Sequence, residues 1–305
     1  MRAILIGTCL IVSLHAFSQQ KKVCITIDDL PAVTNGISGH EVWEEITSGI
    51  VSTLTAYDAH AIGYVNEGKL YREGKLDPKR VALLEKWLKN GQELGNHTYS
   101  HPSYHRVSYQ DFTRNIVQGT KIIKPLAEKH NTEIKYFRHP YLHIGLDKGK
   151  ADSLKTYLKQ QGYIESPVTI DNDDYLFAAA YSRAYRKDDK ELMEQIATDY
   201  LVYMEEKLVF FEAISVELYE RAINQTLLIH ANLLNAHYLD ELLDIYRKHD
   251  YQFVSQEEIL LDKAYDQEVN FFGNYGISWI KRWALSAGKE YSIFKNDPKV
   301  PEYIR

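Results

Sequence analysis

The sequence is poor in cysteine, and it lacks the basic blocks and repeats that define several classes of protein. Only Cys9 and Cys24 occur among 305 residues, so a framework of disulfides is excluded as the basis of the fold. The net charge is −6 and no stretch rich in lysine or arginine stands out, which argues against a nucleic-acid partner. No internal repeat or low-complexity segment is visible, which excludes repeat architectures.

The longest apolar run lies at the N-terminus. Arg2 precedes a nearly all apolar stretch over residues 3–14, and the small residues Ala16 and Ser18 stand at −3 and −1 of a cleavage site. This pattern predicts a secretory signal peptide over residues 1–18, and hence a secreted or periplasmic protein with no stable membrane insertion after cleavage. The run falls short of the ~20 residues that a spanning helix needs. A retained N-terminal anchor is the alternative interpretation.

The rest of the chain has an ordinary globular composition, with 45% hydrophobic and 26% charged residues. Short β-branched runs, such as Val23–Ile27 and Ala61–Val65, alternate with segments that have helical spacing. This alternation predicts βα units around a parallel sheet or barrel. In such folds the functional residues collect at the carboxyl ends of the strands.

Two regions interrupt the alternation. Residues 190–223 contain neither glycine nor proline; they could form a lid or pack on the domain, and we favour packing. The tail after residue 258 is rich in aromatic residues: Phe271, Phe272, Tyr275, Trp279 and Trp283. These could stack on sugar rings or fix the tail as core residues, and we favour the second. We expect a main domain over 19–260 with a helical insertion at about 176–224, and a C-terminal extension over 261–305 packed on it.

Carboxylates and imidazoles follow several of the strand-like runs. Asp28 and Asp29 come directly after Val23–Ile27, and one carboxylate could bind a metal while the other handles protons. His97 and His101 have a spacing that brings two imidazoles to one ion on a helical turn. Two imidazoles and one carboxylate leave coordination positions open, as in catalytic metal sites. An acidic surface turn and a chance pair among 12 histidines are the alternatives.

Three further candidates occupy similar places in the pattern. Arg138 ends a strand-like run and could hold a carboxylate by a bidentate pair, or form a surface salt bridge of little energetic value. Asp171 and His230 each follow another strand-like run. A histidine there can be a general acid whose tautomer a nearby aspartate fixes, although a lone histidine is more often structural.

In their order along the chain, these residues resemble the motifs of the polysaccharide deacetylase family (NodB-homology domain, carbohydrate esterase family 4). Thr-Phe-Asp-Asp-Gly-Pro is matched with two changes at 26–31, His-Ser/Thr-x-x-His at 97–101, Arg-x-Pro-Tyr at 138–141, and Leu-x-His at 228–230. Asp-x-x-Asp-Trp is approximated at 171–175. The resemblance covers roughly residues 22–258.

The resemblance implies a distorted (β/α)7 barrel and a metal-dependent hydrolase. The enzyme would remove acetyl groups, N- or O-linked, from an acetylated glycan or oligosaccharide outside the cytoplasm. The ligands of a divalent ion would be Asp29, His97 and His101. Zinc is the first choice for that ion, and cobalt or another divalent ion is the alternative.

The same positions imply the catalytic roles. Asp28 would be the general base and Arg138 would orient it, while the backbone N–H of Tyr141 would help to hold the oxyanion. The general acid would be His230, with Asp171 as its partner.

The resemblance also implies a substrate pocket, with Leu228 lining the acyl site. Four departures from the motifs are expected at its mouth: Leu30 for Gly, His139 for Pro, Leu142 for Gly and Tyr175 for Trp. Leu30 would occupy a backbone position that suits glycine and add bulk beside the metal. These changes keep two alternatives open, a small-molecule amide or ester as substrate and a non-catalytic glycan-binding protein. We expect His105 and His143 to be structural or solvated, with substrate contact as the alternative.

Overall fold

The computed structural model describes residues 20–305, so the predicted signal peptide lies outside the described residues. Seven strands form one curled sheet, in which all pairs are parallel. The strand order is β7 (Ile164–Glu165), β6 (Tyr136–Phe137), β5 (Glu93–Asn96), β2 (Ala61–Val65), β1 (Lys21–Val33) and β8 (Gln225–Asn232), with β9 (Tyr251–Phe253) also paired to β1. A separate hairpin joins β3 (Tyr71–Arg72) and β4 (Lys75–Leu76).

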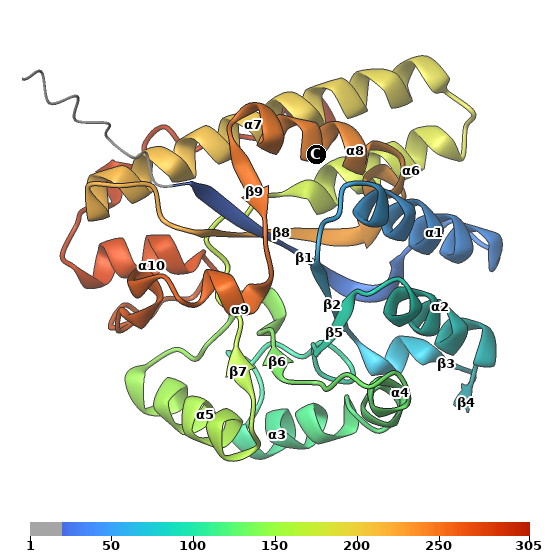
Figure 1. Cartoon of the computed structure of the whole chain (residues 1–305), viewed down its shortest axis with the longest axis horizontal. Helices are drawn as coiled ribbons and strands as arrows, with labels where there is room; N and C mark the ends of the chain where they lie inside the picture. The colour runs from blue at the N-terminus through green and yellow to red at the C-terminus, as the bar shows by residue number, and fades with distance from the viewer. Residues whose placement is uncertain (1–19) are drawn as a thin grey trace, which may run out of the picture.

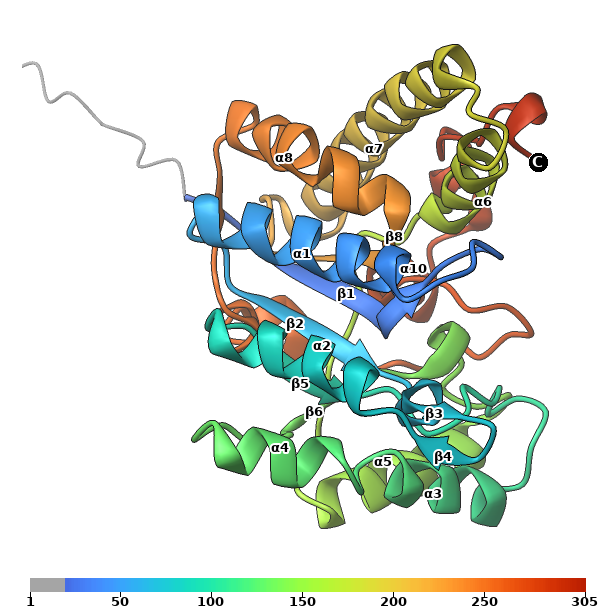
Figure 2. The ribbon, with the colours of Figure 1, turned by 90° about the vertical axis from the view of Figure 1, so that its right-hand side faces the viewer.

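Helices surround the outer face of the curled sheet (Figure 1; Figure 2). They are α1 (Glu41–Ala56), α2 (Pro78–Lys89), α3 (Tyr109–Gln118), α4 (Ile123–Lys129), α5 (Lys148–Gln160), α6 (Asp174–Tyr185), α7 (Lys190–Tyr219), α8 (Leu233–Lys248), α9 (Gln256–Ile259) and α10 (Trp279–Ser286). Five 3-10 turns complete the described elements: η1 (Glu67–Leu70), η2 (Pro140–Leu142), η3 (Lys263–Asp266), η4 (Tyr291–Phe294) and η5 (Glu302–Ile304). Among the described helices, none combines the length and the hydrophobicity that a membrane span requires.

The loop after β7 brings the curled sheet toward closure. Ile170 forms an isolated parallel bridge with Leu227 of β8. The N–H of Thr169 donates to the carbonyl of Thr226 at 3.1 Å, and the N–H of Thr226 donates to Oγ1 of Thr169 at 2.7 Å. The prediction of a distorted (β/α) barrel is therefore confirmed, with seven parallel strands and an open side.

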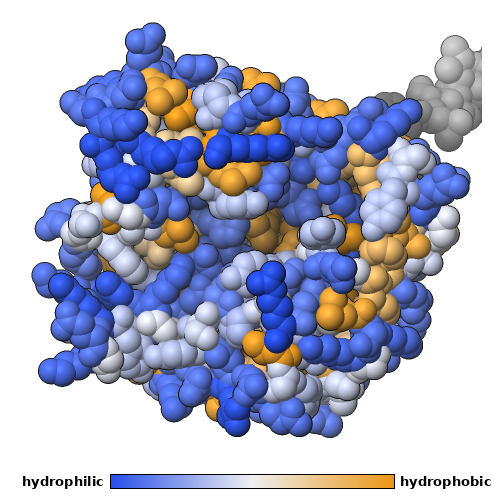
Figure 3. Space-filling model, turned by 180° about the vertical axis from the view of Figure 1, so that it is seen from behind, coloured by the Kyte–Doolittle hydropathy of each residue, from blue (hydrophilic) through white to orange (hydrophobic). Residues whose placement is uncertain are grey.

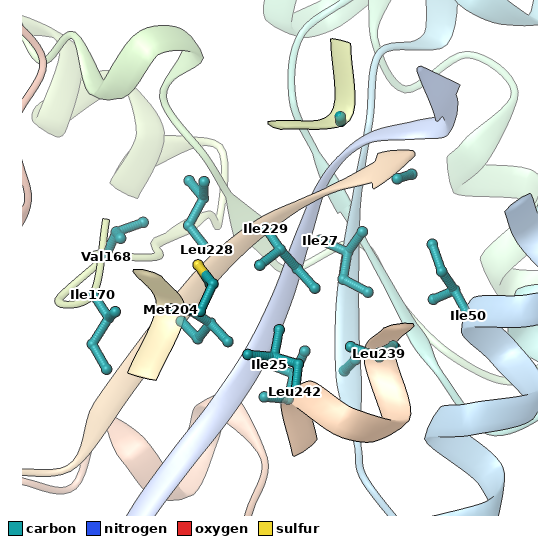
Figure 4. Packing of buried hydrophobic residues seen from close by; sticks show 14 of the residues in the cluster. Ile25, Ile27, Ile50, Val168, Ile170, Met204, Leu228, Ile229, Leu239 and Leu242 are labelled. Carbon is teal, nitrogen blue, oxygen red and sulfur yellow. The ribbon is translucent and has the colours of Figure 1, made fainter. Parts of the chain in front are cut away.

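The alternation of side chains along the strands separates the apolar core from the barrel interior. Ile25 and Ile27 of β1 point outward and pack with Leu239 and Leu242 of α8 (Figure 4). Each fully buried side chain of this kind contributes roughly 1.5–3 kcal/mol of transfer free energy. Thr26 between them points inward, because successive residues of a strand face opposite sides. Its Oγ1 accepts a hydrogen bond from the Arg138 guanidinium at 2.9 Å.

Strand register places two candidate residues side by side. Asp28 is the register partner of His230 across the β1–β8 pair, and both belong to the inward-facing set. The pairing of β1 becomes irregular directly afterwards, between Asp28 and Val33 against β8 and between Ile27 and Leu30 against β2. Irregular pairing of this kind re-aims side chains and is frequent beside functional sites.

The helical insertion and the C-terminal tail both pack on the barrel. In α7, Ile196, Met204 and Phe211 are buried in the main core. In the tail, Trp279 and Trp283 are buried with relative exposures of 6% and 4%. Tyr275 differs from them, since its relative exposure is 82%. The aromatic tail therefore holds core residues as well as exposed rings, such as that of Tyr275.

Candidate functional site

A cavity of about 760 Å³ opens where the carboxyl ends of the strands meet. Figure 3 looks on to this face from behind and shows it hollowed near the centre, with polar residues prominent around the hollow. The volume lies within the usual range for ligand pockets. Its lining includes Asp28, Asp29, His97, His101 and His230. Segments far apart in the sequence therefore meet at one site.

Asp29, His97 and His101 form a group that could hold a metal ion. One ligand atom from each lies within 4.8 Å of the others. The Nε2 atoms of the two histidines are 3.2 Å apart, and Oδ1 of Asp29 is 3.7 Å from the first and 3.6 Å from the second. This is the set of donors that the sequence singled out.

Hydrogen bonding sets the tautomer of His97. Its Nδ1 lies 2.8 Å from the carbonyl oxygen of Arg138, which accepts only, so Nδ1 carries the proton and donates. The lone pair is then on Nε2, which faces Asp29 and His101. Burial lowers the pKa of His97 to about 3 and that of His101, beside it, to about 4. Neutral imidazoles are the form that binds a metal.

Asp29 is held by a residue that no sequence pattern indicated. The Lys69 ammonium donates to the backbone carbonyl of Asp29 at 2.8 Å and lies 3.5 Å from its Oδ2. Burial opposes ionisation of Asp29, but Lys69 and His101 outweigh it and hold the pKa of this carboxyl below its ordinary value. The other oxygen, Oδ1, is buried and accepts no hydrogen bond from residues 20–305. An ionised carboxylate whose free oxygen faces the Nε2 atoms of two imidazoles fits a divalent cation.

The backbone around this site is unusual. Asp29, Thr98, His101, Tyr141 and Leu142 all have positive φ, between 54° and 71°. Non-glycine residues seldom adopt this left-handed conformation, and such strain is concentrated at functional sites. The strain therefore falls on the candidate ligands and their neighbours.

Asp28 lies next to the metal group and is deeply buried, with a relative exposure of 3%. Its Oδ2 is 3.7 Å from Nε2 of His97, and its Oδ1 is 3.6 Å from Nη1 of Arg138. Burial raises the pKa of Asp28, and the Arg138 charge opposes that rise. The structure places Arg138 beside Asp28, as the resemblance implied. The separation of 3.6 Å is too long for a bidentate hydrogen bond, so the contact is electrostatic.

The partner of His230 is Asp174, and the prediction of Asp171 in this place is wrong. Oδ1 of Asp174 lies 2.6 Å from Nδ1 of His230, and its Oδ2 accepts from the His230 backbone N–H at 2.9 Å. Asp171 instead accepts from the N–H of Ser278 at 2.8 Å and lies 3.6 Å from Nζ of Lys281. The reason is that α6 begins at Asp174, and the first turn of this helix directs the Asp174 side chain toward His230 of β8.

Two asparagines complete this unit, and the sequence analysis missed them. Asn232 and Asn235 donate to Oδ2 of Asp174 at 3.2 and 2.9 Å. Burial lowers the pKa of His230, but the Asp174 carboxylate outweighs it and raises that pKa to about 9. His230 is therefore an imidazolium at neutral pH. The signal for Asp174 was available, because the Asp-x-x-Asp-Trp motif contains a second aspartate at that position.

Tyr141 lies at the rim of the cavity. Its ring is 4.4 Å from the ring of His101, centroid to centroid, and its relative exposure is 56%. The backbone N–H of Tyr141 donates to no acceptor within residues 20–305. It is therefore available to a ligand oxygen, in keeping with the role that the resemblance implied.

Two predicted pocket residues, Leu30 and His139, lie outside the cavity, so this prediction is wrong for both. Leu30 is 2% exposed and packs over Gly63, where a Cβ would lie 2.3 Å from the leucine Cδ2. Its φ is not positive; the left-handed residue is Asp29, one position earlier. His139 is 1% exposed, and its Nε2 lies 2.8 Å from Oε1 of Glu165.

The position of Leu30 makes a prediction about stability. Leu30→Ala should lower the free energy of unfolding by about 2–5 kcal/mol, because it leaves a cavity against Gly63 and β2. Urea unfolding followed by circular dichroism measures this change. Leu261→Ala, at a leucine that is 78% exposed, is the control and should change it by less than about 0.5 kcal/mol. An equal, small effect of both substitutions would contradict the buried placement.

The remaining predicted rim residues do line the cavity. Leu228, Leu142 and Tyr175 are all part of its wall. His143 lines it too, and its ring stacks on that of His105 with centroids 3.8 Å apart and an angle of 8°. His143 therefore faces the cavity directly, whereas His105 lies behind it and is not part of the lining.

The comparisons with known proteins agree with this geometry. A family model described as polysaccharide deacetylase matches residues 17–163. No curated protein matches the sequence significantly. The fold is similar to that of the Bc1960 peptidoglycan N-acetylglucosamine deacetylase, with 16% identity, a TM-score of 0.51, and coverage of 79% of this chain and 88% of that one.

Two further solved structures are similar. The polysaccharide deacetylase Bc1974 from Bacillus cereus has 17% identity and a TM-score of 0.50, over 84% of this chain and 100% of that one. A CE4 family pseudoenzyme from Bacillus anthracis has 14% identity and a TM-score of 0.46, over 77% and 63%. At these identities, the two deacetylase structures with TM-scores of 0.51 and 0.50 show a shared fold. The family match over residues 17–163 and the order of the motifs show that this chain is similar to the polysaccharide deacetylase family.

Proposed function

We propose that this protein is a metal-dependent deacetylase that hydrolyses N- or O-linked acetyl groups on a glycan outside the cytoplasm. The observation that carries the proposal is the juxtaposition of three units at one cavity. These are the Asp29–His97–His101 group, the buried base Asp28, and the imidazolium of His230 held by Asp174. The match to the polysaccharide deacetylase model over residues 17–163 supports the deacetylase class, and the sequence of residues 1–18 supports export.

Asp29, His97 and His101 would hold the ion. A bound divalent cation, with zinc as the first choice, would polarise the acetyl carbonyl and increase the acidity of water at the site. Asp28 would accept the proton of the attacking water, since burial raises its pKa and its Oδ1 has no hydrogen-bond donor within residues 20–305. The N–H of Tyr141 would donate to the oxygen on which negative charge develops, which is worth a few kcal/mol in such sites.

His230 would supply the proton to the leaving group. Because Nδ1 is engaged by Asp174, the proton available for transfer is the one on Nε2. An amine needs that proton more than an alcohol does, since the free amide anion is a very poor leaving group. The raised pKa of His230 keeps it protonated before the reaction.

The substitution Asp28→Asn tests the proposal. It should reduce acetate release by at least about 10²-fold, because the amide cannot accept a proton, while zinc content stays the same. Acetate is measured enzymatically and zinc by elemental analysis of the same samples. Asp152→Asn, on an exposed turn of α5, is the matched control and should match the wild type. Unchanged acetate release by Asp28→Asn would exclude this residue as the base.

The structure weakens the main argument for a small-molecule substrate. That alternative depended on four departures from the motifs at the mouth of the site, and Leu30 and His139 are buried away from it. Leu142 and Tyr175 keep their places in the cavity wall. A non-catalytic role is disfavoured by the complete set of proton-transfer and ligand groups.

A further inference from the structure

The turn η2, which carries the Tyr141 N–H, has a strained backbone. Tyr141 and Leu142 are consecutive non-glycine residues in the left-handed region, with φ of 58° and 54°. This conformation is unfavourable for residues with a Cβ and persists only where the surrounding structure holds it. Inside the turn, the N–H of Leu142 donates to the carbonyl of His139 at 3.0 Å, and the N–H of His143 donates to that of Pro140 at 3.1 Å. Further support comes from the C-terminal extension.

Arg282 of α10 makes the first contact between the extension and η2. Its Nη2 donates to the carbonyl oxygen of Leu142 at 2.9 Å. The side chain is fully buried, and its Nε and Nη1 have no hydrogen-bond partner within residues 20–305. Burial lowers the pKa of Arg282 to about 10 and the Asp171 charge opposes that fall, so the guanidinium is cationic at neutral pH. Among the described residues, the acceptor for this buried cation is therefore the carbonyl of the strained turn.

Gly276 makes the second contact. A Cβ at this position would lie 1.7 Å from the carbonyl oxygen of Tyr141 and 3.3 Å from Cδ2 of His143. The φ of Gly276 is not positive, so the glycine is needed for the close approach of the two backbones and not for its conformational freedom. The backbone of the extension therefore lies directly against the Tyr141 carbonyl.

The chain between these two contacts is fastened to the barrel. The N–H of Ser278 donates to Oδ2 of Asp171 at 2.8 Å, and the N–H of Trp279 donates to the carbonyl of Val168 at 2.7 Å. Both acceptors lie in the segment between β7 and α6. The extension is thus fixed between the barrel and η2, and it cannot move away from the turn without breaking these bonds.

The contacts restrict the direction of the Tyr141 N–H. They hold the carbonyl oxygens of Tyr141 and Leu142, and hence two consecutive peptide planes next to that N–H. With both planes held, Tyr141 keeps its left-handed conformation at the cavity wall. A donor that is fixed before the reaction stabilises developing charge more than a mobile one, because no reorganisation is needed as the charge forms.

A purely structural role would be to hold the extension on the barrel. Trp279 and Trp283 are buried in the main core and already do this. A buried guanidinium with two unpartnered nitrogens stabilises a fold less than an apolar side chain of similar volume does. Stability alone therefore does not account for a fully buried arginine at this position.

We infer that the C-terminal extension is a working part of the active site, in which Arg282 and Gly276 are positioning residues for the Tyr141 N–H. Neither residue contacts the reacting atoms, and both act by holding η2. This inference rests on the proposed function and deepens it. It assigns part of the oxyanion stabilisation to a segment outside residues 17–163, the part of the chain that matches the family model.

Steady-state kinetics on a chitin-type oligomer tests the role of Arg282, using the full chain loaded with zinc. Arg282→Met removes the donors and should lower kcat by about 10- to 100-fold while KM stays within about threefold. The reason is that a misplaced oxyanion donor weakens binding of the transition state and not of the substrate. Arg282→Lys keeps a donor, and its kcat should be at least about threefold above that of Arg282→Met. Zinc content should be the same in all three proteins.

A second pair of variants tests the close approach at Gly276. Gly276→Ala must displace the Tyr141 carbonyl and should lower kcat by about tenfold or more. Gly273→Ala is the matched control in the same extension, because a Cβ there would come no closer than 3.4 Å to a neighbouring atom. It should have the kcat of the wild type.

Ile304→Ala separates positioning from simple packing of the extension. Ile304 is 1% exposed, and its carbonyl accepts a hydrogen bond from Arg183 of α6 at 3.1 Å, so the substitution weakens the packing of the extension without touching η2. It should lower the unfolding temperature and leave kcat near that of the wild type at temperatures where the protein is folded.

Hydrogen exchange provides a readout that depends on neither turnover nor metal. The N–H groups of Leu142 and His143 are bonded inside η2, so their exchange rates report how often the turn opens. In the zinc-free protein, Arg282→Met should raise these rates by about tenfold or more, whereas Ile304→Ala should leave them unchanged.

Three results would overturn the positioning role: a kcat of Arg282→Met equal to that of the wild type, an equal fall of kcat in Arg282→Met and Ile304→Ala, or unchanged exchange at Leu142 and His143 in Arg282→Met. Absence of acetate release by the wild type would count against the proposed function instead. The exchange rates would then decide whether the extension holds the turn.

Discussion

Asp174→Asn is expected to move the basic limb of the pH–rate profile by about two pH units toward neutral, and to lower activity at pH 8 by ~10-fold or more. His230 must be protonated to act as the general acid, so activity falls as pH rises through its pKa. In the intact protein the Asp174 carboxylate raises this pKa to about 9 from an ordinary value of 6.5. Without that charge, burial favours the neutral imidazole, and the pKa of His230 falls toward its ordinary value, since only the more distant Asp28 and Asp29 charges still raise it.

The measurement is kcat/KM for acetate release between pH 5 and 10. Asp171→Asn is the matched control, since Asp171 was the expected partner but lies against Ser278 and Lys281. Its basic limb should stay near that of the wild type, whatever happens to KM. A shift of the limb in Asp171→Asn with none in Asp174→Asn would restore the original assignment.

Replacing His97 or His101 of the metal group is expected to lower activity at least as much as Asp174→Asn does. His97→Ala or His101→Ala should lose bound zinc and reduce acetate release on the order of 10³-fold or more. A ligand that binds only the folded state stabilises it, by ~2.7 kcal/mol when present at 100 times its dissociation constant. Zinc should therefore raise the unfolding temperature of the chelator-treated wild type and not that of His97→Ala.

His40→Ala is the control for this experiment. His40 directly precedes α1 and is not part of the cavity lining. It should keep the zinc content, the zinc-dependent rise in unfolding temperature and the activity. If His97→Ala showed the same zinc-dependent rise as the wild type, the Asp29–His97–His101 group would not be the binding site.

The sequence predicted the parts of this molecule that depend on local pattern. The strand-like runs and helical spacings predicted a parallel sheet or barrel, because the apolar periodicity of each element is imposed by the layer that it must bury. The family resemblance narrowed this prediction to a barrel. The same reasoning brought Asp28, Asp29 and His230 to one edge, because carboxyl ends of parallel strands meet there. The structure brings these residues and the His97–His101 pair together as expected.

The errors arose where a side chain's direction depends on tertiary packing. Asp171 and Asp174 are three positions apart, and only the start of α6 decides which of them reaches His230. Leu30 was expected at the mouth, but the irregular pairing of β1 turns it under β2, against Gly63. Lys69 reaches Asp29 from a segment 40 residues away, which no motif contains.

The ion-paired residues Lys207, Lys281 and Asp297 of the cavity wall were beyond prediction for a related reason. Lys207 and Asp297 are 90 residues apart, and both lie in segments that broke the βα alternation. Their composition indicated helices and aromatic packing, which the structure shows. Only the fold reveals that the same segments also contribute charge to the cavity.

The proposed function requires that one metal-centred site in this fold removes acetyl groups from a glycan. Acetate release should be followed on chitin-type oligomers, peptidoglycan and acetylated xylan, with the full chain either stripped by a chelator or reloaded with zinc or cobalt. We expect the stripped protein to be inactive, and the reloaded protein to release acetate from at least one of these glycans. Acetate release that is the same with and without metal, or no release from any glycan by the reloaded protein, would contradict the proposal of a metal-dependent glycan deacetylase.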